Sequence, residues 1–185
     1  MWYVNLRIQS RHVTAIQTTY RGIRFRSRTE ARWAAFFDEL GWPWEYEPHD
    51  LIWYVPDFVL KLDAGGVLCE VKGCNSLDEL RAHTGKVGDS GWEGDALIVG
   101  SGLLDTGSAH SVIGLIGEPN GPNGWHEWSP ARLFGCLSCG HTSVLSEDGC
   151  WRCRVCGVRE GHLGHPEGVL DLWAKATNRV QWRPR

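Results

Sequence analysis

The chain has 185 residues, of which 42% are hydrophobic and 22% charged, and its formal net charge is −3 at pH 7. This composition is typical of a globular protein with one good core and room for a small satellite. It contains no apolar run of membrane-spanning length and no signal-peptide pattern at its N-terminus, so we expect a cytoplasmic protein with no membrane partner. In a reducing compartment, seven cysteines favour metal ligands or free thiols over disulfides.

Charge is distributed unevenly along the chain. Residues 1–35 hold seven arginines and one acidic residue, residues 36–151 hold five basic and eighteen acidic residues, and residues 152–185 hold seven basic and three acidic ones. Basic ends around an acidic centre favour a protein that grips phosphates and cleaves them in between; ordinary solvated charges are the alternative. The arginines spaced to reach a phosphate backbone are Arg21, Arg24, Arg26 and Arg28.

Short alternating segments in residues 1–26 predict strands or an extended arm, and a helix is predicted from Ser27 to Leu40. Glu30 lies at the buried edge of the apolar stripe of this helix. Two interpretations of Glu30 remain open. In the first, a capping box, its carboxylate binds the Ser27 amide; in the second, its carboxylate faces the sheet. The apolar stripe consists of Trp33, Phe36, Phe37 and Leu40.

The segment from Val55 to Gly73 predicts a β-hairpin, because two apolar, β-branched runs flank a glycine-rich turn. Side chains alternate between the two faces of a strand, so Glu70 and Lys72 project to the same side. If Asp57 lies opposite them, two carboxylates and an ammonium group meet at one face of the sheet. Oxygen ligands of this kind suit Mg²⁺ or Mn²⁺, which would hold a scissile phosphate.

The remaining elements before the cysteine-rich segment are predicted from periodicity and turn residues. Short strands are predicted at Trp44–Pro48 and Asp95–Gly100, and a helix capped by Asn75 or Ser76 is predicted at 76–83. Two further strands, at 112–116 and 125–128, lie in a connection rich in glycine and proline.

Two Cys-x-x-Cys motifs, each followed by glycine, are typical of a zinc ribbon with four thiolates around one structural Zn²⁺. The ligands expected on this basis are Cys136, Cys139, Cys153 and Cys156. Cys150 offers another register and would then replace Cys156. The same cysteines could instead hold an iron–sulfur cluster or remain simple free thiols.

The last segments of the chain flank this motif. Thr142–Leu145 is suited to a small hairpin between the two cysteine pairs, and Pro166–Val180 predicts a terminal helix that begins near a proline. Arg179, at the end of this helix, forms a basic tail with Arg183 and Arg185 that would lie along nucleic acid.

Pro56-Asp57 and Glu70-Val71-Lys72 resemble the signature of the PD-(D/E)xK nuclease superfamily. The segment 20–30 and the helix after it are similar to small nucleases encoded by bacteriophages, and the resemblance covers roughly residues 19–100. It implies an α+β (α/β) fold with a restriction-endonuclease-like αβββαβ core. That core and its basic arm would occupy residues 1–130, and the zinc ribbon and terminal helix residues 131–185.

The resemblance also implies roles for individual residues. Asp57, Glu70 and the Val71 carbonyl would bind Mg²⁺ or Mn²⁺, Lys72 would orient the nucleophile, and Glu30 would hold a second metal or a water. We therefore expect a Mg²⁺-dependent endonuclease acting on DNA, in the bacterial host cytosol if it is phage-encoded. The alternatives are a non-catalytic zinc-ribbon DNA-binding protein and a homodimeric Holliday-junction resolvase.

Overall fold

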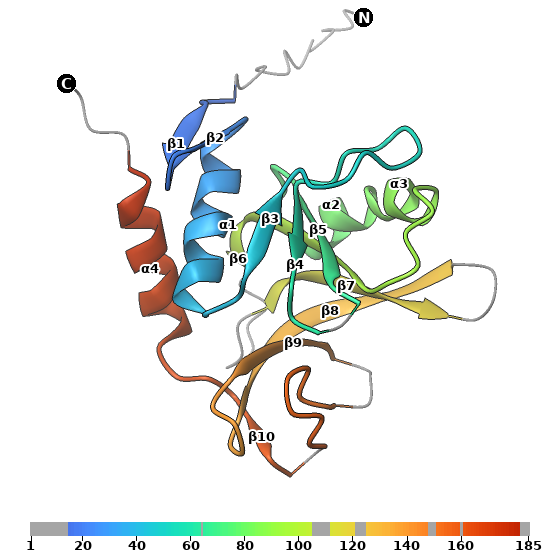
Figure 1. The fold of residues 1–185 in the computed structure, drawn as a ribbon, viewed down its shortest axis with the longest axis vertical. Helices are drawn as coiled ribbons and strands as arrows, with labels where there is room; N and C mark the ends of the chain where they lie inside the picture. The colour runs from blue at the N-terminus through green and yellow to red at the C-terminus, as the bar shows by residue number, and fades with distance from the viewer. Residues whose placement is uncertain are drawn as a thin grey trace, which may run out of the picture.

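The computed structural model describes residues 15–63, 65–104, 112–120, 125–147, 151–159 and 161–181. It is a mixed α+β fold dominated by one large sheet, with a separate two-stranded hairpin beside the first helix (Figure 1). Expected features that lie outside the described residues are the strands or extended arm as far as residue 14, Ala64 in the hairpin turn, Cys150, Arg183 and Arg185. Among the described helices, none is long and apolar enough to cross a membrane.

The elements follow in chain order. They are β1 (Thr18–Tyr20), β2 (Ile23–Phe25), α1 (Arg28–Glu39), β3 (Trp44–Tyr46), β4 (Phe58–Leu60), β5 (Val67–Val71), α2 (Leu77–Arg81), α3 (Thr84–Gly88), β6 (Ala96–Leu104), β7 (Val112–Asn120), β8 (Trp125–Cys136), β9 (Thr142–Ser146), β10 (Leu163–Gly164) and α4 (Val169–Arg179).

Strands of the large sheet run in the order β10-β8-β7-β6-β5-β4-β3, and β9 also pairs with β8. Neighbouring strands are antiparallel except β5 and β6, which are parallel. Two parallel strands need a crossover connection, and α2 and α3 supply it between β5 and β6. The segment from α1 to β6 therefore contains a helix, three strands, two short helices and a strand, in that order.

Helices cover both faces of the sheet. Cys69 and Val71 of β5 belong to the apolar cluster that includes α1 and α4, whereas Leu68 packs with Leu80 of α2 and Val87 of α3. This alternation follows from the two-residue period of a strand. Burial on both faces explains why all residues of β4 and β5 are buried.

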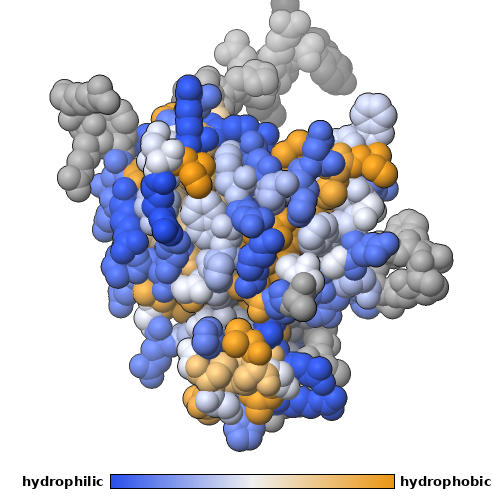
Figure 2. Space-filling view, viewed as in Figure 1, coloured by the Kyte–Doolittle hydropathy of each residue, from blue (hydrophilic) through white to orange (hydrophobic). Residues whose placement is uncertain are grey.

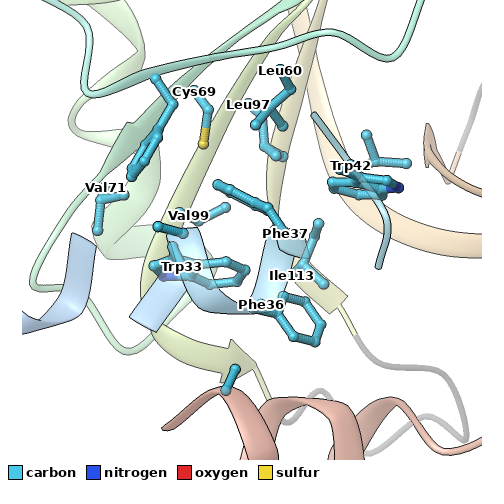
Figure 3. Packing of buried hydrophobic residues seen from close by; sticks show 14 of the residues in the cluster. Trp33, Phe36, Phe37, Trp42, Leu60, Cys69, Val71, Leu97, Val99 and Ile113 are labelled. Carbon is cyan, nitrogen blue, oxygen red and sulfur yellow. The ribbon is translucent and has the colours of Figure 1, made fainter. Parts of the chain in front are cut away.

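The main core lies between α1, α4 and the sheet. Trp33, Phe36 and Phe37 are fully buried, as the predicted stripe requires, and Figure 3 shows Trp33 beside Val99 and Phe36 beside Ile113. The centroids of the Trp173 ring of α4 and the Trp33 ring of α1 lie 4.7 Å apart, and the two helices lie side by side (Figure 1). Ser27 caps α1 by accepting a hydrogen bond from the Glu30 N–H at 3.1 Å, which confirms the predicted helix start.

The hairpin predicted from the glycine-rich turn is confirmed, because β4 and β5 are antiparallel neighbours. The predicted terminal helix is also confirmed, although it begins at Val169, after Gly168 in the left-handed region at φ 69°. The predicted second helix ends at Arg81, and a separate short helix follows.

Thr142–Ser146 is β9, and it forms a hairpin with the preceding strand, at residues 131–135 of β8, which runs without a break as far as Cys136. The predicted small hairpin is therefore not confined to the interval between the two cysteine pairs. Residue 130 therefore lies inside a continuous strand, and the cysteine-rich segment extends the large sheet directly.

Candidate functional site

Two carboxylates lie side by side where β4 begins and β5 ends. The register pairs Phe58 with Cys69, so Asp57, one residue before β4, lies opposite Glu70. Both side chains are almost completely buried, with 4% of each residue exposed. Two buried acids on neighbouring strands are unfavourable for folding unless cations or hydrogen bonds compensate for their charge.

Asp57 is held from two sides. Its Oδ2 accepts the Val71 N–H at 2.8 Å, and its Oδ1 accepts a hydrogen bond from the Arg26 guanidinium at 2.6 Å. Burial and, after it, the neighbouring Glu70 carboxylate raise the pKa of Asp57 to about 6. The Val71 N–H and Arg26 act in the opposite direction, and Glu30 adds to the increase. The site therefore lacks positive charge relative to its carboxylates.

Glu70 has two donors of its own. The Tyr54 hydroxyl donates to Oε2 at 2.6 Å, and the Lys72 ammonium forms an ion pair with Oε1. Burial and the nearby Glu70 charge raise the pKa of Tyr54 well above its usual value, so the phenol stays protonated. Lys72 thus lies on the same side as Glu70, as strand alternation predicts.

Glu30 reaches the same region from the first turn of α1. Its Oε2 accepts hydrogen bonds from the Tyr46 hydroxyl at 2.6 Å and from the Arg26 backbone N–H at 3.1 Å. The capping-box interpretation placed this bond on the Ser27 amide, one residue later. The serine half of that box is present, but the carboxylate turns toward β3, where Tyr46 lies. Burial raises the pKa of Tyr46, which keeps it a donor.

The predicted acidic residues therefore converge, but not equally. Besides burial, the charges of Glu70 and Glu30 both raise the pKa of Asp57, and Lys72 contacts Glu70. Across the described residues, however, a group of three or more ligands with atoms all within 4.8 Å of one another occurs only at the four cysteines. The carboxylates form a close pair, Asp57 and Glu70, with Glu30 further away.

The four arginines expected to contact phosphates do not form one row. Arg21 pairs with Asp38 at 2.8 Å, Arg24 donates to Gln17, and Arg26 bridges Asp57 and Glu47, the latter at 2.8 Å. Arg26 thus belongs to the carboxylate cluster. Arg28 lies close to Arg32, whose pKa is lowered by burial and by the Arg28 charge. Two guanidinium groups near the start of α1 leave an excess of positive charge there.

The four predicted cysteines converge where β8 ends. Their sulfur atoms all lie within 4.8 Å of one another, and the Cys136–Cys156 and Cys139–Cys153 sulfurs are each 3.6 Å apart. Four thiolates around a tetrahedral metal with bonds of about 2.3 Å place their sulfurs about 3.8 Å apart. The cluster therefore has the size and the donor chemistry of a four-cysteine metal site.

Both cysteine motifs have the same backbone geometry. The first residue of each accepts a hydrogen bond from the following glycine, Gly140 to Cys136 at 2.8 Å and Gly157 to Cys153 at 2.9 Å. The glycines have φ of 75° and 73°, where a side chain would be strained. Burial opposes ionisation of Cys153, but the N–H groups of Cys156 and Val155 and nearby thiols outweigh it and lower its pKa to about 6.

Arg154 ties the second cysteine motif to the sheet. Its guanidinium pairs with Asp63 at 2.7 Å and with Asp95 at 2.6 Å. Asp63 follows β4 and Asp95 precedes β6, whereas Asp57 and Glu70 lie at the other ends of β4 and β5. Through Arg154, the second cysteine motif is therefore linked to the edge of the sheet where β4 ends and β6 begins, opposite to the end of β4 where Asp57 lies.

Sequence reasoning missed two residues of the carboxylate cluster, Tyr46 and Tyr54. Tyr46 had a detectable signal, because it shares a strand face with Trp44 and that face packs on α1. Tyr54 lies in a connection and reaches Glu70 only through the tertiary fold. Neither a family model, nor a curated protein, nor a solved structure matches this chain.

Proposed function

We propose that the protein is a metal-dependent endonuclease that hydrolyses phosphodiester bonds in DNA, with a restriction-endonuclease-like core. The observation that carries this proposal is the buried Asp57–Glu70 pair with Lys72 beside it. Pairs of this kind, with the pKa of one member raised by the other, are concentrated at functional sites. The order of elements from α1 to β6 supports the same core.

Asp57 and Glu70, with the Val71 carbonyl, would hold Mg²⁺ or Mn²⁺. Such an ion supplies charge neutralisation, polarises the phosphate and lowers the pKa of a water molecule. Lys72 keeps its ammonium beside Glu70, where it orients the attacking water and offsets charge that develops on the phosphate. Tyr54 fixes the orientation of Glu70 from the opposite oxygen.

Arg26 and Glu30 complete the arrangement. Arg26 supplies positive charge to Asp57, and a divalent cation held by Asp57 and Glu70 would supply it as well. The guanidinium would then be available to contact a phosphate of the substrate. Glu30, held by Tyr46, would hold a second cation or a water at the edge of the pair.

The four-cysteine cluster would hold a structural zinc ion. Four thiolates close the coordination sphere, so no position is left for a substrate or a reactive water. Few of the described residues in the segment 136–159 are buried and apolar, and metal binding would supply the folding free energy that its small core lacks.

One observation favours a second function, a non-catalytic zinc-ribbon protein that binds DNA. Arg26 and Lys72 already pair with Asp57 and Glu70, so the cluster can be regarded as a satisfied ion-pair network. In that case DNA binding would be indifferent to Mg²⁺ and to the substitution Asp57→Asn.

A cleavage assay separates the two functions. Wild type and the variants Asp57→Asn, Glu70→Gln and Lys72→Met are incubated with linear, nicked, branched and single-stranded DNA, in Mg²⁺, Mn²⁺ or no divalent ion. We expect metal-dependent cleavage by the wild type and at least a roughly thousandfold loss in each variant, because each removes charge stabilisation of the transition state. RNA and four-way junctions in the panel test the substrate and the resolvase alternative.

Glu45→Gln is the matched control, because Glu45 is an exposed acid of β3 that pairs with Lys61 on the surface. It should cleave at the wild-type rate. Circular dichroism of every variant checks that the fold is intact. Cleavage of no substrate by the wild type in any metal would leave the binding protein as the better function.

A further inference from the structure

The connection between β3 and β4 contains a tight turn whose bulky apolar side chains are exposed to solvent. Leu51 and Tyr54 exchange backbone hydrogen bonds of 2.8 and 3.1 Å, which close a two-residue turn at Ile52 and Trp53. Trp53 is 97% exposed and Ile52 66%. Figure 2 shows apolar surface at the upper right, where Figure 1 places this connection beside α3.

Trp53 has an unfavourable backbone conformation. Its φ is 58°, in the left-handed region that bulky residues rarely adopt. An indole exposed to this extent removes almost no apolar area from water, so it adds almost nothing to folding stability. Strain without a stabilising contact is typical of functional positions.

The turn is fixed relative to the carboxylate cluster. Tyr54, the residue after Trp53, is 3% exposed, and its hydroxyl binds Glu70 at 2.6 Å. At the base of the connection the Glu47 N–H binds the Asp57 carbonyl at 3.0 Å. Trp53 is therefore one residue from a ligand-orienting side chain, and its backbone cannot move freely away from the cluster.

Positive charge flanks the turn. The Lys86 ammonium lies 4.6 Å from the centroid of the Tyr54 ring, and Lys72 lies on the other side of the Tyr54–Glu70 bond. Both ammonium groups lie near Tyr54, the residue after Trp53, and an exposed indole with positive charge nearby is suited to a partner with flat apolar rings and a polyanionic backbone. Nucleic acid has both features, whereas an apolar protein surface or a lipid tail has no backbone charge for the lysines.

We propose that the Ile52–Trp53 turn, here called the wedge, inserts into the base stack of DNA beside the scissile phosphate. The preferred substrate is then DNA whose stacking is already interrupted by a nick, a mismatch or a branch. Inserting a side chain into an intact duplex costs free energy because bases must be unstacked, and this cost is smaller where stacking is already interrupted. Stacking on an aromatic ring tolerates any base. This inference rests on the proposed nuclease function, because it names the substrate of that site.

The test uses the full-length protein and synthetic duplexes that carry 2-aminopurine, which fluoresces more strongly when it is unstacked. One duplex is intact and the other holds a single mismatch, and Ca²⁺ replaces Mg²⁺ so that cleavage does not interfere. The variants are Trp53→Ala, Trp53→Phe and, as a matched exposed apolar control on α4, Leu170→Ala. Because Trp53 is almost fully exposed, its removal leaves no cavity, and the variants should fold as the wild type does.

We expect Trp53→Ala to bind the mismatched duplex about tenfold more weakly than the wild type and to lose the fluorescence increase. Its preference for the mismatched over the intact duplex should shrink by a similar factor. Trp53→Phe keeps an aromatic ring and should stay within about threefold of the wild type, and Leu170→Ala should be unchanged.

The outcomes separate the wedge from the nuclease function. If Trp53→Ala binds and unstacks DNA as the wild type does, the wedge is overturned even though cleavage persists. If the fluorescence change depends on Trp53 but no DNA is cleaved in Mg²⁺, the nuclease function fails and the wedge stands as a DNA-binding device. If the wild type binds neither duplex, both are overturned.

Discussion

The carboxylate cluster and the cysteine cluster represent two opposite uses of charge. In the first, the strand register places Asp57 opposite Glu70, and burial and the Glu70 charge raise the pKa of Asp57. The folded state therefore disfavours ionisation of Asp57. In the second, four sulfurs are arranged so that one cation would satisfy all of them. We infer that a cation at the first cluster serves chemistry and a cation at the second serves stability.

The largest effect should follow from removing the metal at the cysteine cluster. Cys153→Ser should abolish metal binding there and lower the free energy of unfolding by at least about 3 kcal/mol, since thiolate–metal binding is folding free energy in a segment this small. Elemental analysis and urea unfolding measure both quantities. Cleavage by the fraction that stays folded should be retained, because Arg154 links this segment to Asp63 after β4 and to Asp95 before β6, away from Asp57 and Glu70.

Cys74→Ser is the control for this substitution, because Cys74 is a buried thiol outside the cluster. It should keep one metal ion per chain. If Cys153→Ser retained both its metal and its stability, simple free thiols would be the better description of the cluster.

At the carboxylate cluster we expect a substitution to raise the free energy of unfolding. The pKa of Asp57 is about 6 in the folded protein against 3.8 for a free carboxyl, so the folded state holds its proton more tightly. The contribution of the Asp57 proton to folding stability is present in full below the pKa of the unfolded state, and it is lost as the pH rises through about 6. Asp57→Asn should therefore raise the free energy of unfolding by about 3 kcal/mol at pH 8 and leave it nearly unchanged at about pH 3.

Urea unfolding of the zinc-loaded protein, in buffer without Mg²⁺, measures this difference at the two pH values. The exposed-acid variant Glu45→Gln should show no such gain at pH 8. An Asp57→Asn variant that is less stable than the wild type at pH 8 would mean that Arg26 and the Val71 N–H fully compensate for the charge, and the contrast between the clusters would disappear.

These two clusters were predictable from sequence to different degrees. Cysteine spacing and the glycine after each pair specify the ligands locally, and the identical hydrogen bonds around Gly140 and Gly157 show that each motif folds as a self-contained turn. Hairpin periodicity likewise placed Glu70 and Lys72 on one side of β5. Local patterns predict geometry well where the interacting residues are close in sequence.

Contacts between distant segments were not predictable in this way. Nothing in the local sequence indicates that Tyr54 reaches Glu70 or that Arg26 pairs with Asp57 instead of projecting outward. Each depends on the tertiary arrangement, because the partners are separated by other elements and several side chains compete for each position.

A smaller effect is expected at the junction between the clusters. Arg154→Met removes the ion pairs with Asp63 and Asp95 but keeps the apolar stem, and it should lower the free energy of unfolding by about 2 kcal/mol. Metal content and cleavage rate should stay at wild-type values. Arg159→Ala, at an exposed arginine of the same segment, is the control and should change neither. A loss of cleavage in Arg154→Met would show that the two ends of the sheet are coupled.

The smallest expected effect distinguishes Glu70 from Glu30 within the carboxylate cluster. Tyr54→Phe removes the donor to Glu70 and Tyr46→Phe removes the donor to Glu30, while both rings keep their packing. Each deleted hydrogen bond is worth about 1 kcal/mol, so cleavage should fall about fivefold wherever the carboxylate takes part in the reaction. Measured side by side at saturating Mg²⁺, a loss in both variants would place Glu30 in the reaction. A loss in Tyr54→Phe alone would leave Glu30 with the structural role of binding the Arg26 amide at the start of α1, because its orientation would then not matter to the rate.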